Sequence, residues 1–522
     1  MVTDRGDSLA TLPPPLAALL DGRAYPHRVG TIELIETHIS WVLLTGDYAY
    51  KIKRPVQYSF VDFRSLASRE FYCREELRLN RRYAPDLYLD VCPIARRDGT
   101  IHMGGAGTII EYAVRMRQFD PAQELASLVE RQAVSTDELR GFGASLGALH
   151  ATAPVAANRR EPDRTSRVVL GNITECRAAL STSAARASLD RIAVRLRRQL
   201  ETRLGLIAQR ARTGFIRECH GDLHTRNVAR IGNQLTAFDC LEFEPEFRTI
   251  DVAQEVAFLA MDLQVLGRAD LASAFVNGWL AETGDYQAVE LLDLFEAHCA
   301  LVRAKVCSLS LQRQSVSDQA ALRQHRDRYI DQAATRLARA SPELILMHGL
   351  SGSGKSWLAE RLALAMPAVQ LRSDLERKRR AGLTAQQRSG SRPGEGLYQS
   401  DQTAATYAHL LELAAAVLRG GRSVLVDATF MTRAARAQFV ALGARFATRP
   451  RLIECRAPDH VLQQRLLARE RSGDDPSDAD LAVLAWQRAH AEPVTATEGL
   501  DVLVVDTTDP DVVDQTLWRM MG

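Results

Sequence analysis

Residues 349–356 read "GLSGSGKS", a full match to the pattern GxxxxGK[ST]. The apolar stretch "LILMH" (344–348) precedes them, and a helical pattern, "WLAERLALAM" (357–366), follows. In such a strand–loop–helix context the backbone N–H groups of the loop can surround phosphate oxygens, and the helix N-terminus adds a favourable dipole. The stretch therefore predicts a phosphate-binding loop, and a chance glycine-rich turn does not explain the strand and the helix on either side.

The residues of this loop have separate expected roles. Those predicted to bind a nucleotide are Gly349, Ser351, Gly352, Ser353, Gly354, Lys355 and Ser356. Lys355 is expected to reach the β- and γ-phosphates, and the Ser356 hydroxyl is expected to bind Mg²⁺.

Two aspartates and three arginines follow at positions that suit phosphoryl transfer. Asp374 comes just after the strand-like "AVQL" (368–371), where a carboxylate can accept the proton of an attacking hydroxyl. Asp427 ends the apolar "SVLVD" (423–427) and is predicted to contact Mg²⁺ or substrate. Each aspartate has a plainer alternative as a helix cap or turn residue. Arg469, with Arg465 and Arg471, predicts a lid that neutralises the transferring phosphate, with a solvated helix face as the alternative.

Residues 343–520 resemble the P-loop kinase-like ATPases that include polynucleotide kinases, zeta toxins and chloramphenicol phosphotransferase. The residues that carry this resemblance are "GLSGSGKS", "RSDLERKR" (372–379), "VDATF" (426–430) and the arginine-bearing stretch. Strands alternate with helices here, which predicts an α/β domain with a mostly parallel sheet. The resemblance implies that Asp374 acts as the base, and it leaves the acceptor open.

A second phosphoryl-transfer site is predicted earlier in the chain. "HGDLHTRNV" (220–228) is followed by "AFDCLEF" (237–243), so that Asp239 stands seventeen positions after Asp222. Phosphoryl transfer needs an aspartate to orient the acceptor hydroxyl, and an asparagine and a second aspartate to hold Mg²⁺. Asp222, Asn227 and Asp239 supply all three.

A lysine and a glutamate should complete this second site. Lys51 and Lys53 share one face of the strand-like "YAYKIKR" (48–54), and one of them is expected to reach the α- and β-phosphates. We favour Lys51 because it directly follows the apolar run "YAY". The helical stretch 66–84 offers Glu70, Glu75 and Glu76 as the partner of this lysine, and we favour Glu75.

Residues 25–340 resemble the aminoglycoside phosphotransferase family. The HGDxxxxN signature of that family is matched at His220, Gly221, Asp222 and Asn227, and "FDCLEF" stands where its metal-binding aspartate belongs. The resemblance implies an α+β protein-kinase-like fold, ATP, Mg²⁺ and transfer to a hydroxyl group. A kinase-like domain followed by a P-loop domain also resembles a class of bacterial fusion proteins.

Length and composition agree with two soluble domains. The 522 residues exceed one ordinary core, and 46% apolar with 25% charged residues is typical of globular proteins. The pattern changes at Ser341-Pro342, so we expect a kinase-like domain at 1–340 and a P-loop domain at 341–522. The eight scattered cysteines form no CxxC pair, which favours a reducing cytoplasm, and no apolar run reaches the ~20 residues of a membrane span.

The expected function is a bifunctional phosphotransferase that uses ATP or GTP with Mg²⁺ and acts on small-molecule hydroxyl acceptors. One alternative is a nucleotide-responsive regulator in which one half no longer turns over. Another is a polynucleotide kinase-type activity, suggested by the basic run 377–380, which also fits a solvated helix. The net charge of +2 argues against nucleic acid as the main partner.

Overall fold

The computed structural model describes residues 12–13, 16–58, 61–156, 161–311, 319–338, 341–385, 387, 395–472, 477 and 479–521. The chain divides into two compact units. The first comprises residues 1–138, 149–162 and 205–262, and the second comprises 139–148, 163–204 and 263–522. Among the described residues, no helix combines the length and apolar character needed to cross a lipid bilayer.

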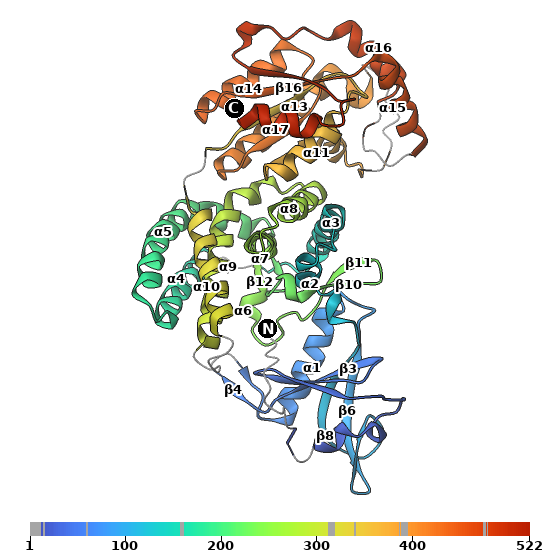
Figure 1. Ribbon diagram of the computed structural model, residues 1–522, viewed down its shortest axis with the longest axis vertical. Coiled ribbons are helices and arrows are strands. Elements are labelled where there is room, and N and C mark those ends of the chain that lie inside the picture. Colours follow the sequence, from blue (N-terminus) through green and yellow to red (C-terminus); the bar gives the residue numbers. More distant parts are fainter. Residues whose placement is uncertain are drawn as a thin grey trace. The chain divides into compact units, whose positions relative to one another are not determined.

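The first unit is built on an antiparallel six-stranded sheet with the order β1-β2-β3-β8-β6-β7 (Figure 1). Its strands are β1 (Glu33–Glu36), β2 (Ser40–Leu44), β3 (Tyr48–Lys53), β6 (Tyr88–Arg97), β7 (Thr100–Met103) and β8 (Thr108–Arg117). Helix α1 (Leu66–Asn80) packs on β6 and β8, where Cys73, Tyr88 and Val114 share one buried cluster. A short hairpin, β4 (Gln57–Tyr58) and β5 (Val61–Asp62), precedes α1. The sheet with one helix is the predicted kinase-like opening.

Short strands and turns carry the catalytic motif in the rest of this unit. Its further elements are α2 (Leu125–Glu130), β9 (Ile216–Glu218), β10 (Val228–Ile231), β11 (Gln234–Ala237), α6 (Pro245–Arg248), β12 (Thr249–Asp251) and the start of α7 (Val252–Val265). β9 pairs with β12, and β10 pairs with β11. The buried Asp251 accepts two hydrogen bonds from Arg210, at 2.8 and 2.9 Å, and so fixes the end of β12.

Long helices form part of the second unit. They are α3 (Thr136–Thr152), α4 (Glu161–Ala179), α5 (Ser183–Arg212), α8 (Ala269–Thr283), α9 (Val289–Leu311) and α10 (Gln319–Arg336), of which α3, α4 and α5, like α7, also contribute residues to the first unit. The apolar sequence of α8 is reflected in its burial: every residue from Leu271 to Leu280 is buried.

A parallel five-stranded sheet with the order β14-β15-β13-β16-β17 completes the second unit. Its strands are β13 (Leu344–His348), β14 (Val369–Arg372), β15 (Val424–Asp427), β16 (Arg451–Arg456) and β17 (Asp501–Asp506). The helices are α11 (Lys355–Ala365), α12 (Ser373–Arg380), α13 (Ser400–Arg419), α14 (Arg433–Arg445), α15 (Asp459–Ser472), α16 (Leu481–His490) and α17 (Val512–Met521). All four residues of β15 are buried, as a parallel strand covered on both faces requires. The predicted α/β domain with its parallel sheet is confirmed.

Candidate active sites

The loop at residues 349–354 joins the central strand β13 to α11, as its sequence predicted. Gly352 has a φ of 82°, and a Cβ there would lie 2.7 Å from the Leu462 carbonyl oxygen, so only glycine fits. The Lys355 ammonium donates to the Leu350 carbonyl at 2.8 Å, across the mouth of the loop. Burial lowers the pKa of Lys355, and the nearby Asp427 works against this shift.

Asp374 and Asp427 lie at the carboxyl ends of β14 and β15, the neighbouring strands on one side of β13. Burial raises the pKa of Asp427, while Arg372 and a hydrogen bond with Ser356 act in the opposite direction. The pKa of Asp374 is lowered: burial would raise it, but nearby groups led by Arg377 outweigh burial. Asp374 is therefore a carboxylate at neutral pH, ready to accept a hydrogen bond from a hydroxyl group.

A single cavity of about 820 Å³ connects the loop to both aspartates. The residues predicted from the sequence that line it are Ser351, Gly352, Gly354, Lys355, Ser356, Asp374, Asp427, Arg465 and Arg469. Gly349 and Ser353 belong to the same loop but are not among the lining residues. The cavity also takes in Arg372 and Arg377, so that positive side chains outnumber the two carboxylates. Its charge suits a polyphosphate.

The predicted lid arginines hold the structure around the loop. Arg465 donates to the Gly352 carbonyl at 3.3 Å and to the Thr507 hydroxyl at 2.9 Å. Arg469 donates to the Ala479 carbonyl at 2.5 Å, and Arg471 is exposed. Residues 473–476 and 478 of the predicted lid lie outside the described residues.

The side chains of the basic run 377–380 all make contacts within the protein, although Arg380 itself is exposed. Arg377 pairs with Asp374 at 3.2 Å, and the buried Lys378 donates to the Ala385 carbonyl at 3.1 Å. Arg379 pairs with Glu376, and Arg380 donates to the Thr406 hydroxyl at 3.3 Å. Arg377 therefore also lines the cavity, and Lys378 and Arg379 contribute to the packing of α12.

The second predicted site lies in the first unit and is an ion-pair network. The Lys51 ammonium lies 2.8 Å from Glu76 Oε1 and 2.5 Å from Asp239 Oδ1. Lys53 is fully buried and pairs with Glu76 and Glu242. Burial acts to lower the pKa of Lys51, but Asp239 and Glu76 raise it well above its usual value. Burial likewise acts to raise the pKa of Asp239, and Lys51 reverses this and brings it to about 2.

Glu75 was the wrong choice of partner for Lys51. Successive residues of a helix point about 100° apart, so only one of two neighbouring glutamates can face the sheet. That residue is Glu76, which is 0% exposed, whereas Glu75 pairs with Arg78 at 2.6 Å and with Arg248 at 2.8 Å. Glu70 pairs with Arg74 one turn away.

The loop from His220 to Asn227 brings the predicted catalytic residues Asp222 and Asn227 together. Asn227 Nδ2 donates to the Asp222 carbonyl at 2.9 Å and to its carboxylate at 3.3 Å. The buried His220 ring is 2.8 Å from the Phe238 carbonyl, which braces the loop against the residue before Asp239. Asp239 itself has a φ of 63° and donates its N–H to the Tyr88 hydroxyl at 3.0 Å.

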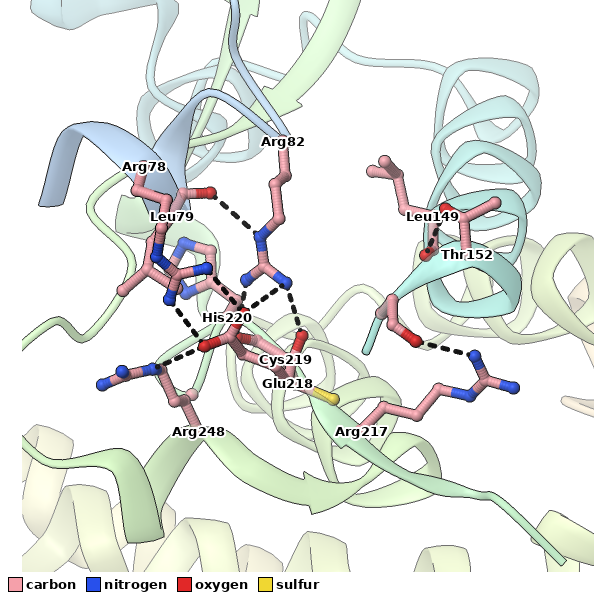
Figure 2. Close-up of polar contacts among 12 residues, drawn as sticks. Arg78, Leu79, Arg82, Leu149, Thr152, Arg217, Glu218, Cys219, His220 and Arg248 are labelled. Atoms are coloured by element: carbon pink, nitrogen blue, oxygen red, sulfur yellow. Dashed lines mark hydrogen bonds and ion pairs between the residues drawn. The ribbon is translucent and has the colours of Figure 1, made fainter. Parts of the chain in front are cut away.

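Arginines tie this loop to the helix that carries Glu76. Figure 2 shows Arg78, Arg82 and Arg248 converging on the end of β9, directly before His220. Arg78 lies 2.7 Å from the Glu218 carboxylate, and Arg82 donates to the Glu218 carbonyl at 2.8 Å. Because α1 carries Glu76 and β9 leads into the loop at residues 220–227, these contacts fix the position of Glu76 relative to that loop.

A cavity of about 180 Å³ opens beside these groups. Its lining combines apolar residues of β1–β3, among them Ile35, Val42 and Ala49, with Lys51, Asn227 and Asp239. Phe119 and Phe238, whose ring centroids are 5.2 Å apart, close one side. An apolar slot that ends at a lysine and two oxygen-bearing side chains suits a flat base joined to phosphates.

Both sites offer oxygen donors of the kind that Mg²⁺ prefers. In the first unit these belong to Asn227 and Asp239. The Asn227 amide NH₂ is already used on Asp222, which leaves its oxygen for a cation. In the second unit they belong to Ser356 and the buried Asp427, whose raised pKa signals a carboxylate that a cation would stabilise.

Several residues of these sites were not predicted. Glu242 lies within the quoted "FDCLEF", three positions after Asp239, and its partnership with Lys53 had no sequence signal of its own. Glu255 accepts hydrogen bonds from the backbone N–H groups of His220 and Gly221, at 2.5 and 3.3 Å. Asp262 accepts from the Thr225 N–H at 2.9 Å and from its hydroxyl at 2.6 Å, so two buried acids brace the catalytic loop.

The chain is similar to several known proteins. Residues 344–494 match the family model of an AAA domain, AAA_33. A gluconokinase from Sinorhizobium meliloti is 19% identical, covers 35% of this chain and 100% of its own, and has a TM-score of 0.25. A choline/ethanolamine kinase family protein from Mesorhizobium loti is 14% identical, covers 59% of this chain and 88% of its own, and has a TM-score of 0.37.

Relatives of nearly full length come from mycobacteria. "Uncharacterized protein Rv2004c" of Mycobacterium tuberculosis is 31% identical over 464 residues, which are 88% of this chain and 90% of that protein. "Uncharacterized protein Mb2027c" of Mycobacterium bovis matches to the same extent. The shared segment is too long to lie within either predicted domain alone. The chain belongs to the family of these mycobacterial proteins.

Proposed function

We propose that the protein is a bifunctional phosphotransferase that moves the γ-phosphate of ATP or GTP to hydroxyl groups of small molecules at two sites. The kinase-like site belongs to residues 1–340 and the P-loop site to residues 341–522. The observation that carries the proposal is that each site keeps a cation for the phosphates, oxygen donors for Mg²⁺ and an aspartate for the acceptor. A regulator with a non-catalytic half would not need all three in both places.

In the kinase-like site, Lys51 holds the α- and β-phosphates while Glu76 fixes the lysine. Asp222 accepts a hydrogen bond from the acceptor hydroxyl and takes up its proton. The acceptor oxygen bonds to the γ-phosphorus as the bond between that phosphorus and the bridging oxygen breaks, and the nucleoside diphosphate leaves. Asn227 and Asp239 would hold Mg²⁺, which neutralises charge on the phosphates when bound.

In the P-loop site, the backbone of residues 349–354 surrounds the phosphates and Lys355 reaches the γ-phosphate. Asp374 orients the acceptor hydroxyl, and Arg465 and Arg469 face the charge that develops during transfer. Ser356 and Asp427 would hold Mg²⁺. Arg377, Lys378 and Arg379 are engaged in contacts within the protein, which supports a small acceptor over a polynucleotide.

A phosphorylation screen against a metabolite library tests the proposal. Labelled ATP would be used with the full chain, with Asp222→Ala, with Lys355→Ala and with the double variant. We expect two groups of labelled products, one lost in each single variant and both lost in the double. Products that survive in the double variant, or the lack of any product with the wild type, would refute the proposal.

A further inference from the structure

We propose that helix α8, which lies outside the P-loop fold, is a working part of the P-loop site because it clamps the segment that carries Asp374. The segment runs from Ala368 through β14 into α12 and ends at Arg380. α8 and this segment belong to the same compact unit. The inference rests on the proposed function in one respect, the role of Asp374 in orienting the acceptor hydroxyl.

The first contact of the clamp is the carboxamide of Asn277. β14 is at the edge of the sheet, and its Val369 N–H donates inward to the Ser423 carbonyl at 2.9 Å. Alternate peptide groups of an edge strand point outward and need another partner. Asn277 Nδ2 donates to the Ala368 carbonyl at 2.9 Å, and Asn277 Oδ1 accepts from the Gln370 N–H at 2.8 Å. One side chain thus pairs with β14 as a neighbouring strand would.

This pairing is specific to asparagine in this place. Asn277 is 6% exposed, so neither outward group of β14 has water as a ready substitute. Aspartate cannot donate to the Ala368 carbonyl, and leucine can neither donate nor accept. Ser273, one turn earlier on α8, adds a hydrogen bond from its hydroxyl to the Ala363 carbonyl in the last turn of α11, at 2.7 Å.

The second contact holds the other end of the segment. Arg379, on α12, donates to the carbonyl of Ala281, one turn after Asn277 on the same helix. α8 ends at Gly284, whose φ is 70°, and a Cβ there would lie 2.7 Å from Arg379 Nε. The glycine therefore gives the arginine room to reach the helix end. Asp374 and Arg377 lie between the two contacts, and both line the large cavity.

Asn277 and Arg379 are accordingly positioning residues for Asp374. Lys355 and Ser356 lie in the first turn of α11, whereas α8 bonds to Ala363 in its last turn, so loosening the clamp should disturb the acceptor side of the cavity more than the nucleotide side. Arg380 offers a matched control, because it is also an arginine on α12 but binds Thr406 and not α8.

Amide hydrogen exchange of the full chain tests the clamp, with Mg·ADP as the probe ligand. In Asn277→Leu we expect the amides of residues 369–380 to exchange roughly tenfold faster or more, since two hydrogen bonds are lost. The affinity for Mg·ADP and the exchange of residues 349–356 should change less than twofold. Arg379→Gln should speed exchange in the second half of the segment, Arg379→Lys should restore most protection, and Arg380→Gln should leave it unchanged.

Turnover completes the test once the screen above provides an acceptor. Well below the melting temperature, Asn277→Leu and Arg379→Gln should lower kcat/KM for the acceptor of the P-loop site at least tenfold and leave the kinase-like site unaffected. Unchanged exchange at 369–380 in both variants, or a lower melting temperature with unchanged kcat/KM, would overturn the inference. If Asn277→Leu fails to fold, the exchange rates of Arg379→Gln and Arg379→Lys, compared with Arg380→Gln, decide whether the clamp exists. If no acceptor exists the proposed function fails, whereas the exchange result still decides whether the clamp exists.

Discussion

The two proposed phosphate sites of this protein are assembled in opposite ways. The proposed nucleotide-binding part of the P-loop site comes from eight consecutive residues. The kinase-like site is made of charged side chains that meet over long separations: Lys51 pairs with Glu76 and with Asp239, 25 and 188 positions away. A contiguous site depends on one loop keeping its shape, whereas a dispersed one depends on the packing of α1, β3 and the catalytic loop together.

The largest expected effect concerns the acceptor side of the kinase-like site. Asp222→Ala should reduce transfer by that site by about 10²–10⁴-fold, because the hydroxyl loses the group that orients it and takes its proton. Nucleotide affinity should stay near that of the wild type, since Lys51, Asn227 and Asp239 remain. Rates measured on a product of the kinase-like site check this, and wild-type turnover would remove Asp222 from its role. Activity at the P-loop site is the internal control.

The stability of the protein should depend strongly on one carboxylate in the ion-pair network of the kinase-like site. Glu76→Gln leaves Lys51 and Lys53 with too little negative charge in a buried place, and breaking a buried pair in this way costs about 3–5 kcal/mol. Glu70→Gln is the matched control, because its contact with Arg74 lies at the surface and is worth about 1 kcal/mol or less. Urea unfolding of both variants measures the difference. Equal losses would mean that α1 has no preferred face toward the sheet.

At the P-loop site, a single substitution should weaken nucleotide binding while the protein stays folded. Lys355→Ala removes one charge that meets phosphate, and we expect a loss of about 2–4 kcal/mol in affinity for Mg·ATP, roughly 30- to 1000-fold. A calorimetric titration of the wild type should show two binding events, and that of the variant should keep only the event of the kinase-like site. An unchanged pair of events would contradict the assignment of the loop.

The smallest expected effect is a difference between Asp239 and Asp427 in how each affects the stability of the protein as the pH changes. The pKa of Asp239 falls from 3.8 to about 2 in the fold, so its stabilisation is complete above about pH 4 and is lost as the pH falls through 2. The pKa of Asp427 is raised, so its stabilisation exists only at low pH and is lost as the pH rises through the raised value.

At pH 7 without metal, Asp239→Asn should therefore lower the melting temperature by a few degrees, and Asp427→Asn should raise it by a similar amount. Thermal melts in EDTA measure both variants beside the wild type. If both variants shift the melting temperature in the same direction, the pKa values of Asp239 and Asp427 are not moved in opposite directions by the fold.

The same contrast explains what the sequence could and could not predict. "GLSGSGKS" and "HGDLHTRNV" are local, so the loop, Asp222 and Asn227 could be predicted from short stretches of sequence, and the strand pattern placed Asp374 and Asp427 at strand ends. Glu76 was one of three candidates, and Glu75 was preferred wrongly, because one position along a helix decides which glutamate meets the sheet and only the packed structure sets that phase. Asn277 was missed because it meets β14 across more than 90 positions of chain.

The two edges of the parallel sheet show a further consequence of the Asn277 contact. An unpaired edge strand is a template for another strand, and proteins with open edges tend to self-associate. β17, at the far edge, ends in Asp501 and Asp506 and exposes Val502 and Val504 by 40% and 41%. β14 carries no such charges within its strand before Arg372, and α8 covers its outward peptide groups instead. We therefore expect a P-loop fragment cut free of α8 to self-associate more readily, because its parallel sheet would have two open edges where the parallel sheet of the whole chain has one.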